Sequence, residues 1–342
     1  MNLEQLQYCP STLAEGYTTY SPVALRRLFD GARVSHVLPF APPTVNEETA
    51  AAFIDNRKRL SVSGVQEKSS MVLDGKSLRL THAHEQGQYI LKPIPRDLKR
   101  VDQAPMNEHL TMQIAEQVFG IRTAANALVF FADGTPAYLT RRFDLGADGH
   151  KWGSEDFASL AGKTSENAGP NFKYNYSYEA LGLVLQEFLP AWRVEIEKLF
   201  QLVVFNYLFS NGDAHLKNFS VLESPQGDYF LSPAYDLLNT RLHVDDTDFA
   251  LSAGLFADDH RSEEWIKQGH PAYADFVELA QRWQMRPKRT AKLLDSYLEK
   301  TDEVVQLVER SLLASNAKRG YIQDFRTRRN YLKKGSPQDV SS

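Results

Sequence analysis

Short apolar runs separated by turn residues fill the stretch from residue 61 to residue 142. Two of the gaps between these runs hold the pairs Asp74–Gly75 and Asp133–Gly134, and an Asp-Gly pair favours the tight turn of a β-hairpin. The pattern therefore predicts antiparallel sheet in this part of the chain. The predicted strands are residues 71–73, 78–81, 89–92, 127–131 and 137–140.

One segment inside this strand-rich stretch has helical spacing instead. Leu110, Ile114 and Val118 recur every four residues within residues 107–119, so they would share one face of a helix. Gly120 follows at the position where helices commonly end, because glycine adopts the left-handed backbone conformation without strain. We expect an amphipathic helix that ends at Gly120.

Helical spacing dominates the chain after residue 142. A strand-rich half followed by a helix-rich half predicts an α+β fold of two lobes with a cleft between them. The first sixty residues are interrupted by prolines and are predicted to be mostly irregular. Further elements are predicted at residues 47–59 (helix), 177–189 (helix), 194–209 (helix), 219–222 (strand) and 229–231 (strand).

Four segments follow from this pattern. Residues 1–60 would pack on the smaller lobe as an irregular segment. Residues 61–143 would form that small sheet-rich lobe, and residues 144–334 the larger helical lobe. Residues 335–342 are predicted to be a disordered tail.

Composition excludes only a few classes of protein. The chain has 342 residues and a formal net charge of −4, which indicates no general affinity for nucleic acid or membranes. No apolar run approaches the ~18 residues of a membrane-spanning helix, and residues 1–11 lack the apolar core of a signal peptide. Cys9 is the one cysteine, which excludes a disulfide framework within the chain. We expect a cytoplasmic protein without membrane contact.

Chemically capable residues are densest at residues 211–218, which read Asn-Gly-Asp-Ala-His-Leu-Lys-Asn. Asp213 and Asn218 stand five positions apart, as do the catalytic Asp and the metal-binding Asn of protein kinases. That Asp accepts the proton of the attacking hydroxyl, and the Asn oxygen holds Mg²⁺ against the phosphates. Asp236 follows the predicted strand pair, where kinases place a second Mg²⁺-binding Asp. Each motif alone also suits a solvated loop, but the combination favours phosphoryl transfer from ATP.

Residues in the strand-rich half could complete such a site. Lys92 ends a predicted strand, from which its ammonium group can reach the α- and β-phosphates, although an edge-strand lysine facing water has the same pattern. Glu108 begins the following helix and is a candidate to orient Lys92, although glutamate also simply favours the first turn of a helix. Backbone N–H groups around Ser63, Gly64 and Val65 are a further candidate contact for phosphate.

Six stretches together resemble the HipA family of serine/threonine kinases, the toxins of bacterial toxin–antitoxin systems. They follow the order of the family across roughly residues 60–240. The resemblance implies a protein-kinase-like fold, with a small sheet-rich N-lobe and a larger helical C-lobe. The stretches are Ser61-Val-Ser-Gly-Val-Gln-Glu-Lys68, Tyr89-Ile-Leu-Lys-Pro93, Asn107-Glu-His109, Arg141-Arg-Phe-Asp144, Asn211-Gly-Asp-Ala-His-Leu-Lys-Asn218 and Tyr235-Asp-Leu237.

The resemblance also implies a role for each matching residue. Asp213 would be the catalytic base, and Asn218 and Asp236 would hold Mg²⁺. The segment from Arg141 to Phe143 would form the hinge against adenine, chiefly through backbone atoms. The implied ATP-binding residues are Lys92, Arg141, Phe143, His215 and Lys217, with Ser63, Gly64 and Val65 of the serine loop.

Regulation and partners follow from the same resemblance. Family members phosphorylate themselves in the serine loop, which switches the enzyme off, so Ser61 and Ser63 are candidate autophosphorylation sites. Known substrates of the family include aminoacyl-tRNA synthetases. The partner antitoxins are helix-turn-helix proteins of the HipB kind, so contact with DNA would be indirect.

The chain is most similar to the short HipT type of the family. Sixty residues precede Ser61, fewer than in HipA proper, and Ser63 supplies a second serine in the loop. HipA proper carries a further small N-terminal subdomain before the serine loop. HipT belongs to three-gene systems, in which a separate small HipS-like protein resembles that subdomain and acts as antitoxin. Such a protein is therefore a further expected partner.

Two other functions remain compatible with these residues. A catalytically silent, kinase-shaped module would only dock a DNA-binding antitoxin, although the intact Asp213, Asn218 and Asp236 argue against it. A small-molecule phosphotransferase shares the same Asp–Asn spacing. Separately, residues 317–334 hold seven basic side chains against one acidic residue, Asp324, which predicts a solvated helix or a patch for nucleic acid or an acidic partner.

Overall fold

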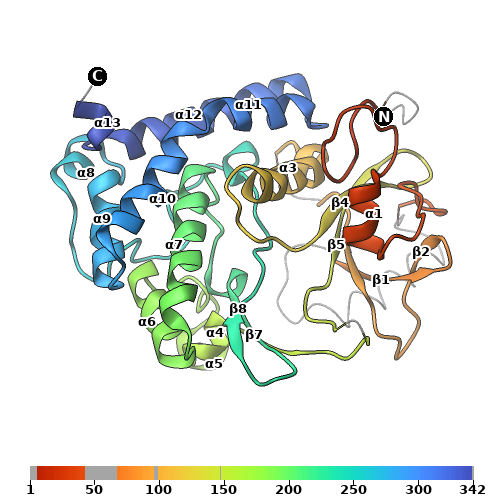
Figure 1. The fold of residues 1–342 in the computed structure, drawn as a ribbon, viewed down its shortest axis with the longest axis horizontal. Coiled ribbons are helices and arrows are strands. Elements are labelled where there is room, and N and C mark those ends of the chain that lie inside the picture. Colours follow the sequence, from red (N-terminus) through yellow and green to blue (C-terminus); the bar gives the residue numbers. More distant parts are fainter. Residues whose placement is uncertain (1–5, 43–67, 96–98, 147, 341–342) are drawn as a thin grey trace.

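The computed structural model describes residues 6–42, 68–95, 99–146 and 148–340. Its sheet-rich part and its helical part lie at opposite ends of the molecule (Figure 1). Two helices, α11 (Thr301–Arg310) and α12 (Ser315–Lys333), lie along one side, where α11 contacts α3 (Ala104–Gln117) and α12 contacts α7 (Trp192–Leu208). The expected α+β division of the chain is therefore present.

The larger sheet has five antiparallel strands in the order β2-β1-β3-β5-β4. Both predicted hairpins are present, and Gly75 and Gly134 adopt φ angles of 60° and 82° in their turns. Lys92 pairs with Tyr138 on a central strand, so it is not an edge-strand lysine. The strands are β1 (Ser69–Asp74), β2 (Ser77–Leu80), β3 (Tyr89–Lys92), β4 (Asn126–Phe130) and β5 (Pro136–Arg141).

Helix α3 packs on β4 and β5 and ends as predicted, where Gly120 has a φ of 67° and donates to the carbonyl of Glu116 at 3.1 Å. The expected amphipathic character was wrong. Glu108 is buried along with the apolar residues, because the helical lobe covers the side of α3 that faces away from the sheet. One of these contacts joins the hydroxyls of Thr111 and Tyr321 on α12 at 2.8 Å.

Residues 6–42 cover the other face of the sheet. They contain α1 (Pro22–Phe29), which begins at the cap residue Ser21. Tyr20 donates to the carbonyl of Leu128 and Tyr89 to that of Leu28, each at 2.9 Å. These buried bonds fix the segment on the sheet across more than sixty residues of sequence. The helix predicted at residues 47–59 lies outside the described residues.

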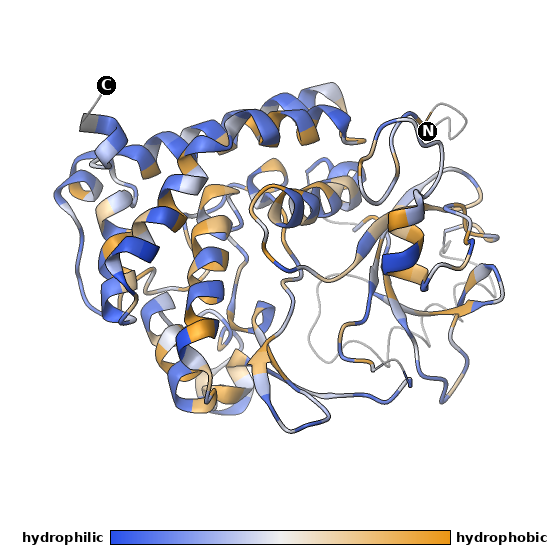
Figure 2. Ribbon diagram, in the orientation of Figure 1, coloured by the Kyte–Doolittle hydropathy of each residue, from blue (hydrophilic) through white to orange (hydrophobic). Residues whose placement is uncertain are grey.

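The helical part is built around α7, whose residues are largely buried. Figure 2 shows apolar residues concentrated along α6 and α7 and in the strands, whereas α12 is mostly hydrophilic. A three-stranded sheet, β6-β7-β8, lies beside these helices. The elements are α4 (Phe157–Leu160), α5 (Ser165–Ala168), α6 (Tyr178–Phe188), α8 (Glu263–Gln268), α9 (Tyr273–Arg282), α10 (Pro287–Glu299), β6 (Gly153–Asp156), β7 (Ser220–Glu223) and β8 (Tyr229–Leu231), with short 3₁₀ turns η2 (Val101–Gln103), η3 (Leu216–Asn218) and η4 (Thr240–Leu242).

The last described residues correct two expectations. A helical turn, α13 (Pro337–Val340), follows the fully buried Ser336, so the expected disordered tail is ordered to residue 340. The basic helix α12 is not uniformly solvated, because Arg328 is only 2% exposed and forms an ion pair with Asp248. In the described ranges, no helix is both long enough and apolar enough to cross a membrane.

Candidate active site

Lys92 lies at the end of β3 and is almost fully buried. Its Nζ donates to Glu108 Oε1 on α3 at 2.6 Å, and it also donates to Asp236 Oδ1. The ion pair considered for Lys92 and Glu108 is therefore present, and a carboxylate from the helical lobe joins it. Lys68 approaches the other oxygen of Asp236 at 3.8 Å.

Charge is distributed unevenly among these buried groups. Although burial opposes ionisation, the carboxylates of Asp236 and Glu108 raise the pKa of Lys92 above its ordinary value. Burial also opposes the charge of Asp236, but the ammonium groups of Lys92 and Lys68 hold its pKa well below the usual range. For Glu108 burial outweighs the attraction of Lys92 and raises the pKa. The firm ion pair is thus Lys92–Asp236, and Glu108 is the acid that protonates more readily.

The predicted catalytic loop follows α7 and is fixed by its backbone. Gly212 donates its N–H to Thr240 Oγ1 at 3.0 Å, which ties the loop to the segment after Asp236. A Cβ on Gly212 would lie 2.3 Å from the carboxylate carbon of Asp246, so a larger residue there would force the Asp246 side chain to move. The next residue, Asp213, is exposed, and its carbonyl accepts from the N–H of His215 at 2.8 Å.

The two predicted metal ligands lie side by side. Asn218 Nδ2 donates to Asp236 Oδ2 at 3.2 Å, and Asn218 Oδ1 accepts from the N–H of His215 at 3.2 Å, which leaves that oxygen a second lone pair. Asp236 has a φ of 55°, a backbone conformation that few residues except glycine, Asn and Asp adopt readily. Mg²⁺ prefers oxygen ligands and is commonly bound by one or two carboxylates together with substrate phosphates, so this pair fits it. Among the described residues no set of three His, Cys, Asp or Glu side chains is arranged to hold a metal without such help.

Tyr174 is the partner of the predicted base. Its hydroxyl donates to Asp213 Oδ1 at 2.8 Å. Although Asp213 is exposed as a residue, partial burial of its carboxyl group raises its pKa, while the hydrogen bond from Tyr174 and the charge of Lys173 act in the opposite direction. The sequence analysis missed both residues, and only the run of aromatic residues near position 174 set this loop apart.

The remaining predicted nucleotide contacts are dispersed around this centre. Phe143 packs against Tyr235, the neighbour of Asp236, with ring centroids 5.4 Å apart. Arg141 instead directs its guanidinium to Asp30 of the N-terminal segment, with both contacts at 2.7 Å, so any adenine contact of Arg141 would come from its backbone. Lys217 lies 3.8 Å from Asp156.

His215 is held in the neutral form. Burial, with the nearby charge of Lys173, lowers the pKa of His215 to about 4. Its ring packs edge-on against Tyr174 with centroids 5.2 Å apart. The imidazole therefore lies beside the predicted base without carrying a charge at neutral pH. The predicted serine-loop residues Ser61, Ser63, Gly64 and Val65 lie outside the described residues.

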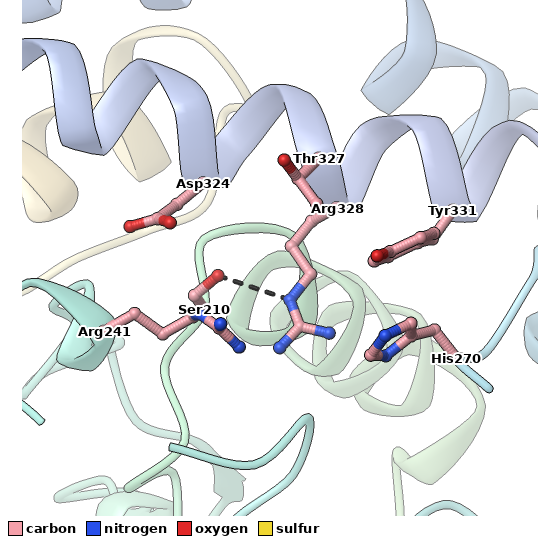
Figure 3. Close-up of a pocket in the computed structure, with 7 residues that line it drawn as sticks. All are labelled: Ser210, Arg241, His270, Asp324, Thr327, Arg328 and Tyr331. Carbon is pink, nitrogen blue, oxygen red and sulfur yellow. Dashed lines mark hydrogen bonds between the residues drawn. The ribbon is translucent and has the colours of Figure 1, made fainter. Parts of the chain in front are cut away.

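A separate cavity of about 140 Å³ lies between α12 and the residue that precedes the catalytic loop (Figure 3). Its charged side chains already have partners, because Arg328 and His270 both bind Asp248 and Asp324 accepts from Asn239 at 3.0 Å. This network holds the segment after Asp236 against α12. The residues that line it are Ser210, Arg241, His270, Asp324, Thr327, Arg328 and Tyr331.

Residues 60–305 match the family described as HipA-like C-terminal domain. The chain belongs to this family. The match covers the five-stranded sheet, both halves of the Lys92–Asp236 pair and most of the helical part of this HipA-like protein. The resemblance carried by the six sequence stretches is thereby confirmed at the level of the family.

Three similar proteins match this chain over different shares of its length. The HipA-like chain is 24% identical over 327 residues to a protein of Haemophilus influenzae named putative kinase, and the match covers 92% of each. It is 32% identical over 222 residues to putative kinase Y4mE of Sinorhizobium fredii, which covers 62% of this chain and 48% of that protein. It is 26% identical over 212 residues to the serine/threonine-protein kinase toxin HipA of Shewanella oneidensis, which covers 56% and 46%. The chain thus spans most of the first relative and about half of the other two.

Two solved structures share the fold. A structure described as the HipA, HipB and operator DNA complex of the Shewanella oneidensis toxin–antitoxin system matches with a TM-score of 0.61 at 20% identity, covering 80% of this chain and 65% of that one. The proinflammatory kinase CtkA of Helicobacter pylori matches with a TM-score of 0.50 at 12% identity, covering 77% and 93%. The expected kinase-like, two-lobed α+β fold is confirmed.

Proposed function

We propose that this protein is an ATP-dependent serine/threonine protein kinase of the HipA type. One observation carries the proposal. Lys92 bonds Glu108 and Asp236, and Asp236 in turn bonds Asn218, which belongs to the same short loop as Asp213. Phosphoryl transfer needs a cation for the phosphates, oxygen ligands for a metal and a base for the attacking hydroxyl, and residues of all three kinds support the proposal. The names of the relatives, putative kinase and kinase toxin, support the same function.

Asp213 is the base in the proposed reaction. The substrate hydroxyl oxygen forms its bond to the γ-phosphorus while the bond from that phosphorus to the β–γ bridging oxygen breaks, and ADP leaves. The proton of the hydroxyl passes to Asp213. Because Tyr174 already bonds one lone pair of Oδ1, we assign the proton to the other carboxylate oxygen.

The other residues bind and orient the nucleotide. Lys92 contacts the α- and β-phosphates, and Glu108 holds its ammonium group in place. Asn218 and Asp236 would hold Mg²⁺, which supplies neutralisation of the β- and γ-phosphate charge when bound. The further proposed ATP contacts are Arg141, Phe143, His215 and Lys217, with the backbone of Ser63, Gly64 and Val65.

The cellular role that we propose is arrest of translation in the cytoplasm by a HipT-like toxin. The substrate would be an aminoacyl-tRNA synthetase, and phosphorylation of Ser61 or Ser63 by the enzyme itself would restrain it. The proposed partners are a HipB-like antitoxin, through which DNA is reached indirectly, and a small HipS-like protein. The relative named toxin HipA, and the fold shared with a structure whose title names HipA, HipB and operator DNA, support this role.

The test is ATP consumption by the purified protein with and without Mg²⁺ and bacterial lysate, followed by mapping of the phosphate. The Asp213→Asn variant serves as the base-dead control. Phosphate on serine or threonine of a protein supports the kinase. Phosphate on a small molecule supports a small-molecule phosphotransferase instead. Absence of ATP use by protein that still binds its antitoxin overturns the proposal in favour of a silent docking module.

A further inference from the structure

Tyr174 makes the one side-chain hydrogen bond that the structure gives to Asp213 within the described residues. Its ring is held from two sides, edge-on by His215 at 5.2 Å between centroids and by the ammonium group of Lys173 4.9 Å from the ring centroid. A ring packed in this way loses little further entropy when its hydroxyl bonds Asp213. The Tyr174 hydroxyl is therefore placed beside the carboxylate in advance.

The backbone around Tyr174 is attached to the catalytic loop itself. The carbonyl of Lys173 accepts from the N–H of Leu216 at 3.1 Å, and the carbonyl of Tyr174 accepts from the N–H of Ser252 at 2.8 Å. A little further along, the hydroxyl of Tyr178 donates to the carbonyl of Ala214 at 2.9 Å. These bonds make the loop and the base one rigid unit, so a shift of Asp213 relative to Tyr174 would break backbone contacts too.

The side chains of Lys173 and Tyr174 lower the pKa of Asp213. A hydrogen bond donated to a carboxylate stabilises its charged form, and so does a nearby ammonium group. Both the Tyr174 hydroxyl and the Lys173 charge therefore oppose the water loss that raises the pKa of Asp213. Among the residues that the structure describes, no direct ion pair neutralises the carboxylate, which is kept available as an acceptor.

We propose that Lys173 and Tyr174 position the base for the phosphoryl transfer proposed above, an inference that rests on that function. Tyr174 holds Oδ1 and fixes the rotation of the carboxylate, so that the other oxygen faces the substrate hydroxyl. Lys173 holds the ring of Tyr174 and supports the negative charge. Both are positioning residues, since they act on the substrate only through Asp213.

The first test measures Asp213 directly and needs no turnover. In protein labelled with ¹³C at aspartate carboxyl groups, the Asp213 resonance is assigned from its loss in Asp213→Asn and titrated by NMR. We expect the pKa of Asp213 to rise in Tyr174→Phe and in Lys173→Met. Tyr176→Phe is the matched control, because it removes the same atom from the same loop, where the ring lies near Lys163 instead, and should leave the titration unchanged.

The second test measures catalysis in the same variants. The acid limb of the pH profile of kcat should move to higher pH in Tyr174→Phe, and kcat near neutral pH should fall by about tenfold through loss of alignment. KM for ATP should stay within about twofold, because Tyr174→Phe keeps the ring that packs against His215. Thermal unfolding of each variant checks the fold, and Lys173→Met keeps the test open if Tyr174→Phe is unstable.

The outcomes separate this inference from the proposed function. An unchanged Asp213 titration in both variants overturns the positioning role even if wild-type protein phosphorylates its substrate. A raised pKa in protein that never transfers phosphate supports the positioning of the carboxylate and overturns the kinase. A tenfold loss of kcat with an equal loss in Tyr176→Phe also overturns the role, because the loop would then act only as structure.

Discussion

At the scale of single residues, the ammonium group of Lys92 bonds two carboxyl groups whose pKa values are shifted in opposite directions. Asp236 keeps its charge, whereas burial favours the protonated form of Glu108. The arrangement lets the ammonium group contact a phosphate without leaving two buried negative charges unpaired. It also makes the stability of the protein depend on a residue whose proposed purpose is catalysis.

A prediction follows for Lys92→Met. Removal of the ammonium group leaves Glu108 and Asp236 without their cation, so the free energy of unfolding should fall by about 3 kcal/mol. The double variant Lys92→Met, Asp236→Asn should recover most of this loss, because the carboxylate that keeps its charge is neutralised, yet it should remain inactive. Urea unfolding at pH 7 measures both values. Lys76→Met in the exposed β1–β2 turn is the control and should change stability by less than about 0.5 kcal/mol.

Asp213→Asn tests the base itself. The amide has the shape of the carboxylate and can still accept from the Tyr174 hydroxyl, so the thermal midpoint should not change. Phosphoryl transfer should fall by ~10²–10⁴-fold because the base is lost. Asp228→Asn, in the exposed turn between β7 and β8, is the matched control. Turnover of the Asp213 variant at the wild-type rate would remove Asp213 from the mechanism.

At the scale of elements, α6 and α9 approach each other through a glycine. A Cβ on Gly182 of α6 would lie 2.2 Å from Cε2 of Trp283, which follows α9 and is fully buried. The indole has no room to move, because its Nε1 donates to the carbonyl of Glu179 at 3.0 Å. The glycine is thus required by packing, although glycine is a poor helix former.

The same substitution in two helices should therefore have different effects. Gly182→Ala should lower the free energy of unfolding by about 1–3 kcal/mol, since overpacking outweighs the gain in helix propensity. Gly320→Ala in α12 should leave it unchanged or raise it by up to about 1 kcal/mol, because the nearest atom is the flexible Cδ2 of Leu242 at 3.2 Å. Chemical unfolding of both variants decides the matter. Equal losses in the two would show that the Trp283 contact is not the cause.

Elements whose pattern is local could be predicted from the sequence. The strand β3 (Tyr89–Lys92) was predicted with the bounds that the structure has, because apolar residues and a following proline define it. The strand β6 (Gly153–Asp156) was missed, since it has no apolar residue and exists only through its pairing with β7. The amphipathic expectation for α3 failed for a related reason, because the second covering layer of α3 comes from helices far along the chain.

Some residues of the candidate site could likewise be predicted from local sequence, and others could not. Asp213, Asn218 and Asp236 could be proposed because their combination and order along the chain resemble those of kinases. Tyr174 could not, since its contact with Asp213 spans 39 residues and depends on how one loop folds over another. The buried ion pair of Arg328 could not be predicted either, because the sequence of a polar helix does not indicate which of its basic side chains is buried.

At the scale of the whole molecule, residues 6–42 are attached to α3 as well as to the sheet. His109 Nε2 donates to the carbonyl of Ser11 at 2.8 Å, and Gln117 donates to that of Thr12 at 2.9 Å. Burial lowers the pKa of His109 to about 4. Burial therefore favours the neutral imidazole, although the hydrogen bond to Ser11 acts in the opposite direction, and the stability of the whole fold is linked to pH.

The sign of this linkage can be worked out. Between about pH 4 and the ordinary value near 6.5, the unfolded chain binds a proton at His109 that the folded chain does not. The free energy of unfolding should fall as the pH drops through this window, by up to about 1.4 kcal/mol per pH unit for this group. His109→Gln keeps a donor for Ser11 and should show a shallower slope in urea unfolding from pH 4.5 to 7.5. His215 adds a slope of the same sign, so part of the dependence remains, and parallel curves would contradict the assignment to His109.

The position of α12 has a consequence for the order in which the protein is made. This helix bonds α3 through Tyr321 and holds the segment after Asp236 through Asp324. On the ribosome, the strand with Lys92 emerges first and the loop with Asp213 later, but α12 follows both. A nascent chain therefore contains every proposed catalytic residue before it contains α12, the helix that bonds both α3 and the segment after Asp236. The proposed arrest of translation would in this way begin only after α12 has left the ribosome.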